Sequence, residues 1–254
     1  MAIVAALTAG VEAQSRFFFG MSVALLLILL VGFAPTLYLR PFFDVAPIPL
    51  YLYIHGAVLT GWFLFLCLQT SLIAAGRHDL HRRLGIVGAF STLLVIIASL
   101  MAGLLKASRL NAMGVDLAAR IGRDSGIFWS NAGSLLIFLT FVLAAVVLRH
   151  RTEAHKRLML LGSINIMGPP FGRIARWPIF DGSGADAWLE RSFSIGGILL
   201  LMLVLLGYDL SVRRRLHPAT LIGCAGIILV RIASITIAST ETGQAIVLGT
   251  ATLM

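Results

Sequence analysis

The chain has 254 residues, of which 59% are hydrophobic and only 12% are charged. Soluble domains carry roughly 45–50% apolar and about 25% charged residues, so this composition excludes an ordinary soluble protein. The formal net charge is +9, but the basic residues gather at the ends of long apolar runs, where they anchor topology and contact anionic lipid rather than nucleic acid.

Seven apolar stretches follow one another along the chain, and each is long enough to cross a bilayer as a helix. The predicted spans are about 17–39, 50–75, 85–106, 127–148, 157–173, 193–211 and 218–239. Asn165 and the run Gly168-Pro169-Pro170 predict a break near the far end of the fifth helix. The pattern predicts an all-α polytopic membrane protein with seven transmembrane helices in a single domain, residues 1–254, and a short amphipathic surface helix over 112–121.

Every second link between the spans is short and basic. Links 76–84, 149–157 and 211–217 carry ten of the twenty Lys and Arg residues, and Arg16 before the first span adds an eleventh. The opposite links are longer and hold most of the acids: Asp116, Asp124, Asp181, Asp186 and Glu190. Because basic residues close to span ends favour the cytoplasm, we expect these three links and the N-terminus inside, the C-terminus in the periplasm, and the protein in a bacterial inner membrane.

The starts of three spans resemble one another. The third begins with His81-Arg82-Arg83-Leu84-Gly85 and the fifth with His155-Lys156-Arg157-Leu158-Met159, while Arg215-Leu216-His217-Pro218 before the seventh is a looser match. One hypothesis is that three related helical hairpins follow the first span. The alternative is convergence, because basic residues collect at cytoplasmic span ends in unrelated helices too.

The basic span ends predict two kinds of binding. Helix N-termini and basic side chains attract phosphate, so anionic lipid headgroups are expected at Arg82, Arg83, Lys156, Arg157, Arg214 and Arg215. Imidazole is a common metal ligand, and His81 and His155 are the candidates for a metal or haem site if their links meet. The alternative is that these histidines are interfacial residues among arginines, whose positive charge opposes cation binding.

Ionisable residues within a span are costly and are therefore candidates for function. His55 lies about five residues into the second span and Arg231 about thirteen into the seventh, which at about 1.5 Å per residue places both in the outer half of the membrane. With Asn131, Arg173 and Arg176 they form a predicted ligand-binding cluster without an acid, suited to an anion, a quinone carbonyl or a lipid headgroup. The alternative is that His55 and Arg231 donate to backbone carbonyls freed by the broken fifth helix.

A family likeness rests on several of these motifs. The run His55…Trp62…Gln69…His81-Arg82-Arg83-Leu84-Gly85, followed by His155-Lys156-Arg157-Leu158 and by Arg173 and Arg176, resembles uncharacterised bacterial multi-pass membrane proteins with a His-Trp-Gln-His-Arg-x-Leu-Gly signature. The resemblance covers about residues 50–176 and implies no settled activity. A fainter likeness is to transmembrane di-haem cytochromes b, in which each haem has two axial histidines on facing helices. Only His55 is offered at the outer side, so that likeness implies at most an inner haem b held by His81 and His155.

The leading hypothesis is a non-enzymatic membrane protein, either an accessory subunit of a larger membrane complex or a component that binds lipid or an anion. It rests on the lack of a catalytic constellation, since no Ser/His/Asp set or carboxylate pair is expected at a shared depth. One alternative is an electron-transfer protein holding haem b or a metal, and another is a small-molecule transporter in which the broken fifth helix lines a path past His55 and Arg231. Membrane lipids and other membrane subunits are the expected partners, and nucleic acid is not.

Overall fold

The computed structural model describes residues 2–177 and 187–253, and in this part of the chain every regular element is a helix. Six helices are long and apolar enough to cross a membrane. They are α1 (Ala2–Phe33, continued by a π-helical turn, Ala34–Tyr38), α2 (Leu50–Ala74), α3 (His78–Ala112), α4 (Ile121–Val147), α7 (Ala187–Arg213) and α8 (Pro218–Ser239). The predicted all-α, multi-pass membrane fold is confirmed.

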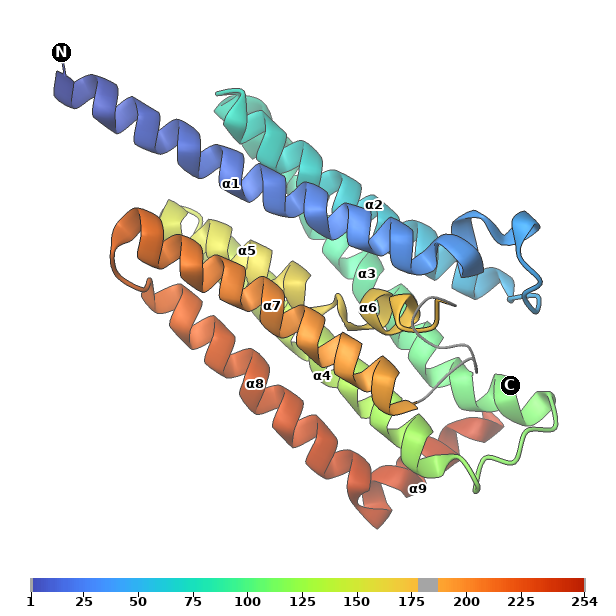
Figure 1. The fold of residues 1–254 in the computed structure, drawn as a ribbon. Coiled ribbons are helices and arrows are strands. Elements are labelled where there is room, and N and C mark those ends of the chain that lie inside the picture. The colour runs from blue at the N-terminus through green and yellow to red at the C-terminus, as the bar shows by residue number, and fades with distance from the viewer. Residues whose placement is uncertain (1, 178–186, 254) are drawn as a thin grey trace.

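Two short helices, α5 (Thr152–Asn165) and α6 (Gly168–Ile174), replace the fifth predicted span. Pro169 and Pro170 stand at the start of α6, where the missing proline N–H costs nothing. In a continuous helix their rings would clash with carbonyls four residues earlier, so the helix breaks. Because α4 ends and α7 begins at opposite ends of the bundle (Figure 1), α5 and α6 together make the seventh crossing.

The α5 helix lies inside the bundle, between α1, α4, α7 and α8. Eight of its 14 residues are buried, and Leu161 and Ile164 have no exposed surface. Asn165, Met167 and Gly168, at the break before α6, are buried as well, so protein covers most of the backbone there. A break of this kind is tolerated in a membrane only where lipid does not reach it.

The predicted amphipathic helix over 112–121 is wrong. With 35 residues, α3 is roughly 50 Å long and extends beyond a hydrocarbon core about 30 Å thick, so it carries the first residues of the link itself. It ends at Ala112, and Gly114 just beyond has a φ of +72° that allows Val115 N–H to donate to the Leu110 carbonyl at 3.1 Å. Turns then lead to Ile121, where α4 begins.

A further helix, α9 (Glu241–Gly249), follows α8 and was not predicted from the hydropathy pattern. Thr240 caps it, since its Oγ1 accepts from the Gly243 N–H at 3.0 Å. The α9 helix packs on α4 and α8, and the 3-10 turn Thr250–Thr252 that follows packs on α3, where Ser108 Oγ donates to the Thr250 carbonyl at 2.9 Å.

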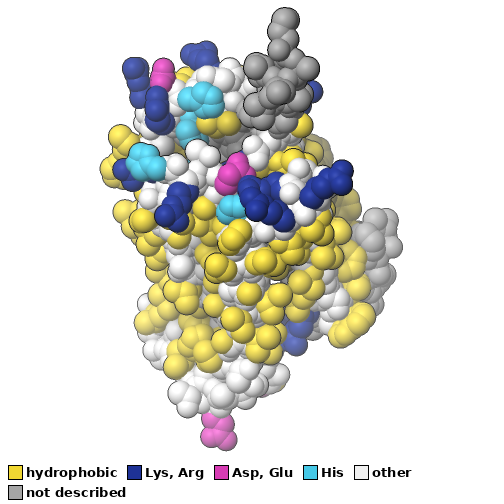
Figure 2. All heavy atoms as spheres, turned by 90° about the vertical axis from the view of Figure 1, so that its left-hand side faces the viewer, with side chains coloured by type: hydrophobic (Ala, Val, Ile, Leu, Met, Phe, Trp, Pro, Cys, Tyr) yellow, Lys and Arg dark blue, Asp and Glu magenta, His cyan; other side chains and the backbone are white. Residues whose placement is uncertain are grey.

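Large apolar side chains face outward along the spans. Leu27 is 55% exposed, Ile86 68% and Ile222 70%, and Figure 2 shows a broad hydrophobic surface below the charged end. A contiguous apolar surface of this extent suits lipid rather than water. The protein is therefore an integral membrane protein.

Two of the three proposed hairpins are packed pairs. The antiparallel helices α2 and α3 lie against each other, as do α4 and α5. In the third, α7 packs chiefly on α6, whereas α8 packs along α4. The hairpin hypothesis therefore describes the packing of the first two pairs and not that of the third.

Candidate functional site

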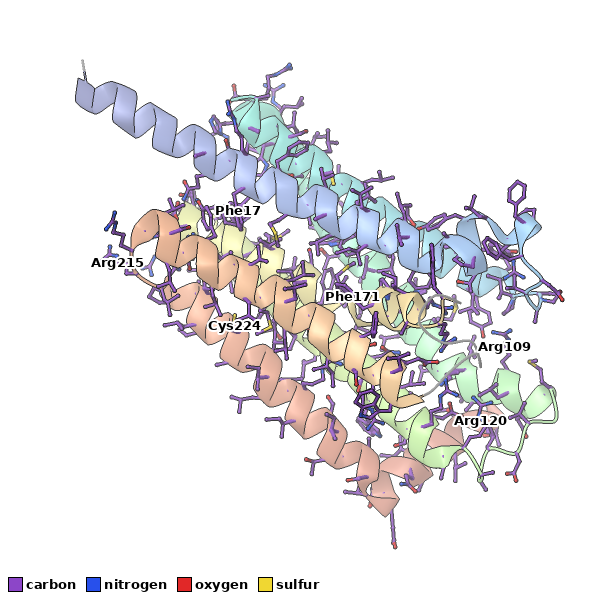
Figure 3. The ribbon with its side chains drawn as sticks, viewed as in Figure 1. Phe17, Arg109, Arg120, Phe171, Arg215 and Cys224 are labelled. Atoms are coloured by element: carbon purple, nitrogen blue, oxygen red, sulfur yellow. The ribbon has the colours of Figure 1, made fainter. Side chains whose placement is uncertain are left out.

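The three basic links lie at one end of the bundle, together with the start of α1 (Figure 1). Figure 2 shows Lys, Arg and His side chains gathered at this end, and Figure 3 shows Arg215 pointing away from the α7–α8 turn. The exposed arginines of these links are Arg77, Arg82, Arg83, Arg149, Arg151, Arg214 and Arg215. We call this set the basic surface.

Arg157 does not belong to the basic surface. Its side chain is fully buried, as is that of Asp209 on α7. Arg157 Nε donates to Asp209 Oδ1 at 3.0 Å, and its Nη2 donates to the same oxygen. Thr220 Oγ1 of α8 donates to Asp209 Oδ2 at 2.6 Å. The prediction that Arg157 contacts anionic lipid is wrong, because α5 is enclosed by other helices and the guanidinium is neutralised inside the protein.

Glu153, in the first turn of α5, gathers donors from three helices. Its carboxylate accepts from Lys156 Nζ at 2.5 Å, Arg213 Nη1 at 2.6 Å, Arg157 Nη1 at 2.7 Å and Gln14 Nε2 at 3.1 Å. Burial favours the neutral acid, but the hydrogen bonds and charges of Lys156 and Arg157 outweigh it and lower the pKa of Glu153 to about 2. The carboxylate thus joins α1, α5 and α7. Lys156, expected to contact lipid, directs its ammonium to this carboxylate instead.

His217 connects the same cluster to α8. Its Nδ1 accepts from the Ala219 N–H at 3.0 Å and so caps the helix, while its own backbone N–H donates to Asp209 Oδ2 at 3.1 Å. Burial, together with the positive charges of Arg157 and Arg213, lowers the pKa of His217. A neutral ring is the form that can accept the capping hydrogen bond.

The two histidines considered as metal or haem ligands lie next to each other. His81 and His155 are each the fourth residue of a helix, α3 and α5. Their ring centroids are 6.3 Å apart and their planes are nearly perpendicular, at 86°. His155 Nδ1 hydrogen-bonds the Ala145 carbonyl at 2.8 Å, which leaves its Nε2 with a lone pair. His81 Nδ1 is buried and has no hydrogen-bond partner among the described residues.

A polar face of α2 leads away from this pair. The Gln69 backbone carbonyl interacts with the His81 ring, and the Gln69 side chain is only 8% exposed, yet neither of its amide atoms has a partner in the described part of the chain. One heptad earlier, Trp62 Nε1 donates to Ser163 Oγ of α5 at 3.2 Å. His55 lies a further heptad along, and its Nδ1 is also buried without a partner among residues 2–177 and 187–253.

The predicted outer cluster divides into separate sites, of which one joins His55 and Arg173. Arg173 of α6 donates to Thr36 Oγ1 at 3.2 Å, and its guanidinium lies 4.6 Å from the centroid of the Phe33 ring. Its positive charge acts on the His55 ring. These two members of the predicted cluster are therefore neighbours, at the outer end of α1.

Arg231 lies at a different interface, between α4, α5 and α8. It donates to Ser134 Oγ at 3.3 Å, in a small pocket that Asn165 also lines. Asn165 Nδ2 donates to the Ser134 carbonyl at 2.7 Å. Asn131 is exposed on the surface of α4. The grouping of Arg231 and Asn131 with His55 is thus not what the structure shows.

The expectation that this region lacks an acid is wrong. Glu190 at the start of α7 accepts from Arg176 Nε at 2.6 Å and from Arg123 Nη2 at 3.2 Å, so Arg176 already has a counter-ion. Asp181 and Asp186 lie outside the described residues. A bound anion is therefore not needed to neutralise Arg176.

Several polar residues of these clusters were missed in the sequence. Asp209 lies inside a predicted apolar span, and an acid at such a position is itself a signal for a buried partner. Lys106 Nζ donates to the buried Asp124 carboxylate at 2.7 Å, a pair that joins α3 to α4. Neither partner lies in a motif, and the sequence places Asp124 in a link rather than in a span, so no sequence signal pointed to this pair.

Comparison of the chain with known protein families, with curated proteins and with solved structures gives no match.

Proposed function

We propose that the protein is a non-enzymatic component of the bacterial inner membrane that binds anionic lipid headgroups through its basic surface and serves as an accessory subunit of a larger membrane complex. The supporting observation is that most of the basic surface is unpaired. Six exposed arginines have no carboxylate partner among the described residues: Arg77, Arg83, Arg149, Arg151, Arg214 and Arg215.

The acids near this end do not neutralise the six arginines. Asp209 is fully buried against Arg157, and Glu153 is shared by three basic side chains. Asp79 pairs with Arg82 at 2.6 Å. Each exposed Lys or Arg near a membrane surface attracts anionic lipid by about 1 kcal/mol, so six of them favour an anionic leaflet strongly.

The same surface supports an orientation. Basic residues at span ends favour the cytoplasmic side, so the basic surface and the N-terminus face the cytoplasm, and α9 faces the periplasm. The resemblance to uncharacterised bacterial multi-pass proteins is part of this proposal.

The accessory role is supported by how the buried polar residues are used. The pairs Arg157–Asp209 and Lys106–Asp124 join helices to each other, and the second pair also lines a small pocket between α3, α4 and α9. Glu190 likewise bridges α4 to the end of α6. Buried polar groups that pair between helices hold those helices in place, which suits a rigid scaffold within a complex.

Native mass spectrometry of the chain purified in mild detergent tests the lipid-binding proposal. We expect retained anionic lipid, and we expect Arg214→Gln/Arg215→Gln to reduce its amount more strongly than the amount of zwitterionic lipid. A matched control is Arg109→Gln/Arg191→Gln, which removes two charges at the opposite end. Equal lipid retention by both variants, or a preparation with neither lipid nor a partner protein, overturns the proposal.

A further inference from the structure

We propose that Gln69, His81 and His155 form a binding site for one transition-metal ion, copper(I) above all, at the inner ends of α2, α3 and α5. This inference uses none of the exposed arginines. The metal-site proposal can therefore be tested independently of lipid binding.

The separation of the two rings fits a shared ion. Metal–nitrogen bonds to histidine are about 2.0–2.1 Å, so two histidines on one ion have ring centroids roughly 5 to 6.3 Å apart as the N–metal–N angle opens from tetrahedral to linear. The observed 6.3 Å corresponds to the linear limit. His155 also shows the supporting contact of a metal ligand, since its other nitrogen is held by the Ala145 carbonyl at 2.8 Å.

The unpaired atoms around the rings point to a ligand. Buried polar atoms in folded proteins nearly always have a partner. Here both amide atoms of Gln69 and Nδ1 of His81 are buried with none among the described residues. An ion between the rings would engage an imidazole nitrogen from each helix, and the unpaired side-chain oxygen of Gln69, whose backbone carbonyl interacts with the His81 ring, is the candidate for a further donor.

The chemistry of the donors selects the ion. Imidazole and amide groups are neutral, and the described residues contain no cluster of three His, Cys, Asp or Glu able to hold a metal ion, so an ion here has two imidazoles and no anionic ligand. Met159 lies one turn beyond His155 on the same face of α5, and its thioether is a soft donor. Imidazole ligands suit copper, and a thioether is the kind of soft ligand that selects copper(I), whose single charge needs no carboxylate.

The two helices present the histidines in the same way. Asp79 and Glu153 are the second residues of α3 and α5, and each pairs with the basic residue three positions on, Arg82 at 2.6 Å and Lys156 at 2.5 Å. These acids offset the positive ends of the helix dipoles beside the site. The site thus joins equivalent positions of two hairpins, which gives the repeated His-(Arg/Lys)-Arg-Leu motif a structural purpose.

The test is metal binding by the purified full-length chain in detergent, with copper(I) under reducing conditions as the probe. We expect one equivalent per chain by elemental analysis, and at least about tenfold weaker binding in His81→Ala and in His155→Ala. His78→Ala is the matched control, because this histidine is exposed in the same turn of α3, and it should bind like the wild type. Gel filtration and thermal unfolding establish that each variant is folded, and His81→Gln provides a milder replacement.

Each other outcome counts against the site. Wild-type protein without stoichiometric copper overturns the proposal, as does an equal loss of copper in His78→Ala and His81→Ala. Tighter binding of zinc than of copper(I) overturns the choice of ion. A haem absorption band that depends on His81 and His155 replaces the ion with haem b. Since the basic surface is unchanged in all of these variants, failure of the metal site leaves the lipid experiment unaffected.

Discussion

Arg157 and Asp209 are fully buried, so the charge of Asp209 depends on the Arg157 guanidinium for its neutralisation. Removing one partner of a buried ion pair costs about 3–5 kcal/mol, because the remaining charge has neither solvent nor counter-ion. We therefore expect Arg157→Ala to lower the free energy of unfolding by about 3–5 kcal/mol. Chemical unfolding in mixed micelles measures this difference.

The repeated motif supplies a matched control for this prediction. Arg83 holds the position in α3 that Arg157 holds in α5, but it is exposed, so Arg83→Ala should change the free energy of unfolding by less than about 0.5 kcal/mol. Arg157→Lys keeps the charge but loses the forked geometry and should fall between the two. Equal effects of Arg83→Ala and Arg157→Ala would show that the pair does not stabilise the fold.

Glu153 makes stability depend on acid pH. Its pKa in the folded protein, about 2, lies below the ordinary value of 4.5, so folding favours the ionised form. Its contribution to stability is present above pH 4.5 and is lost as the pH falls from there through about 2. We expect the wild type to lose thermal stability across this window and Glu153→Gln to lose less. Glu241→Gln, exposed on α9, should behave like the wild type, and a Glu153→Gln profile identical to it would refute the assignment.

At the level of helices, α6 is held by close backbone contact with α1. A Cβ added at Gly32 would lie 2.5 Å from the Pro170 carbonyl oxygen, a backbone atom that cannot rotate away. We expect Gly32→Ala to cost about 1–3 kcal/mol of unfolding free energy by forcing α6 away from α1. Gly20→Ala on the same helix meets nothing within 4 Å and should be neutral or stabilising by up to about 1 kcal/mol. Similar stability of the two variants would mean that α6 is not fixed by this contact.

The helices differ in how far their ends can be predicted from the residues nearby in sequence. The break between α5 and α6 was predictable because Pro169 and Pro170 act on their own backbone. The end of α3 was not, because it depends on Gly114 adopting a positive φ eight residues beyond the last predicted residue of that span, 106. Hydropathy locates the membrane-crossing part of a helix, whereas caps decide where the helix ends.

In the candidate site, too, some features can be predicted from local sequence, whereas others depend on how the helices pack. The heptad spacing of His55, Trp62 and Gln69, which puts them on one face of α2, can be read from the sequence. Which arginine of the repeated motif is buried was not predictable, because Arg157 and Arg83 have similar neighbours in sequence and differ only in packing. Arg157 meets Asp209, 52 residues away, only because α5 is enclosed by the other helices.

For the whole molecule, the arrangement of the crossings makes the orientation testable. The structure places the α2–α3, α4–α5 and α7–α8 turns at one end of the bundle and the α3–α4 link at the other (Figure 1). In a background with Cys67→Ala and Cys224→Ala, we expect Arg83→Cys, Arg151→Cys and Arg214→Cys to react with an impermeant thiol reagent only after the cells are opened. Asp116→Cys should react in intact cells.

The three turn positions must behave alike, since an odd number of crossings separates them from Asp116. Four positions rather than one are needed, because a reversed orientation and a different set of membrane crossings give different labelling patterns. Reaction of all three turn positions in intact cells, with Asp116→Cys protected, would reverse the orientation and put the basic surface in the periplasm while leaving the fold intact. Reaction of only one or two of them would contradict the fold itself, because turns at one end of a bundle cannot lie on both sides of a membrane. Where Arg83→Cys and Arg151→Cys react differently, His81 and His155 would also lie on opposite sides, and the metal site would be lost.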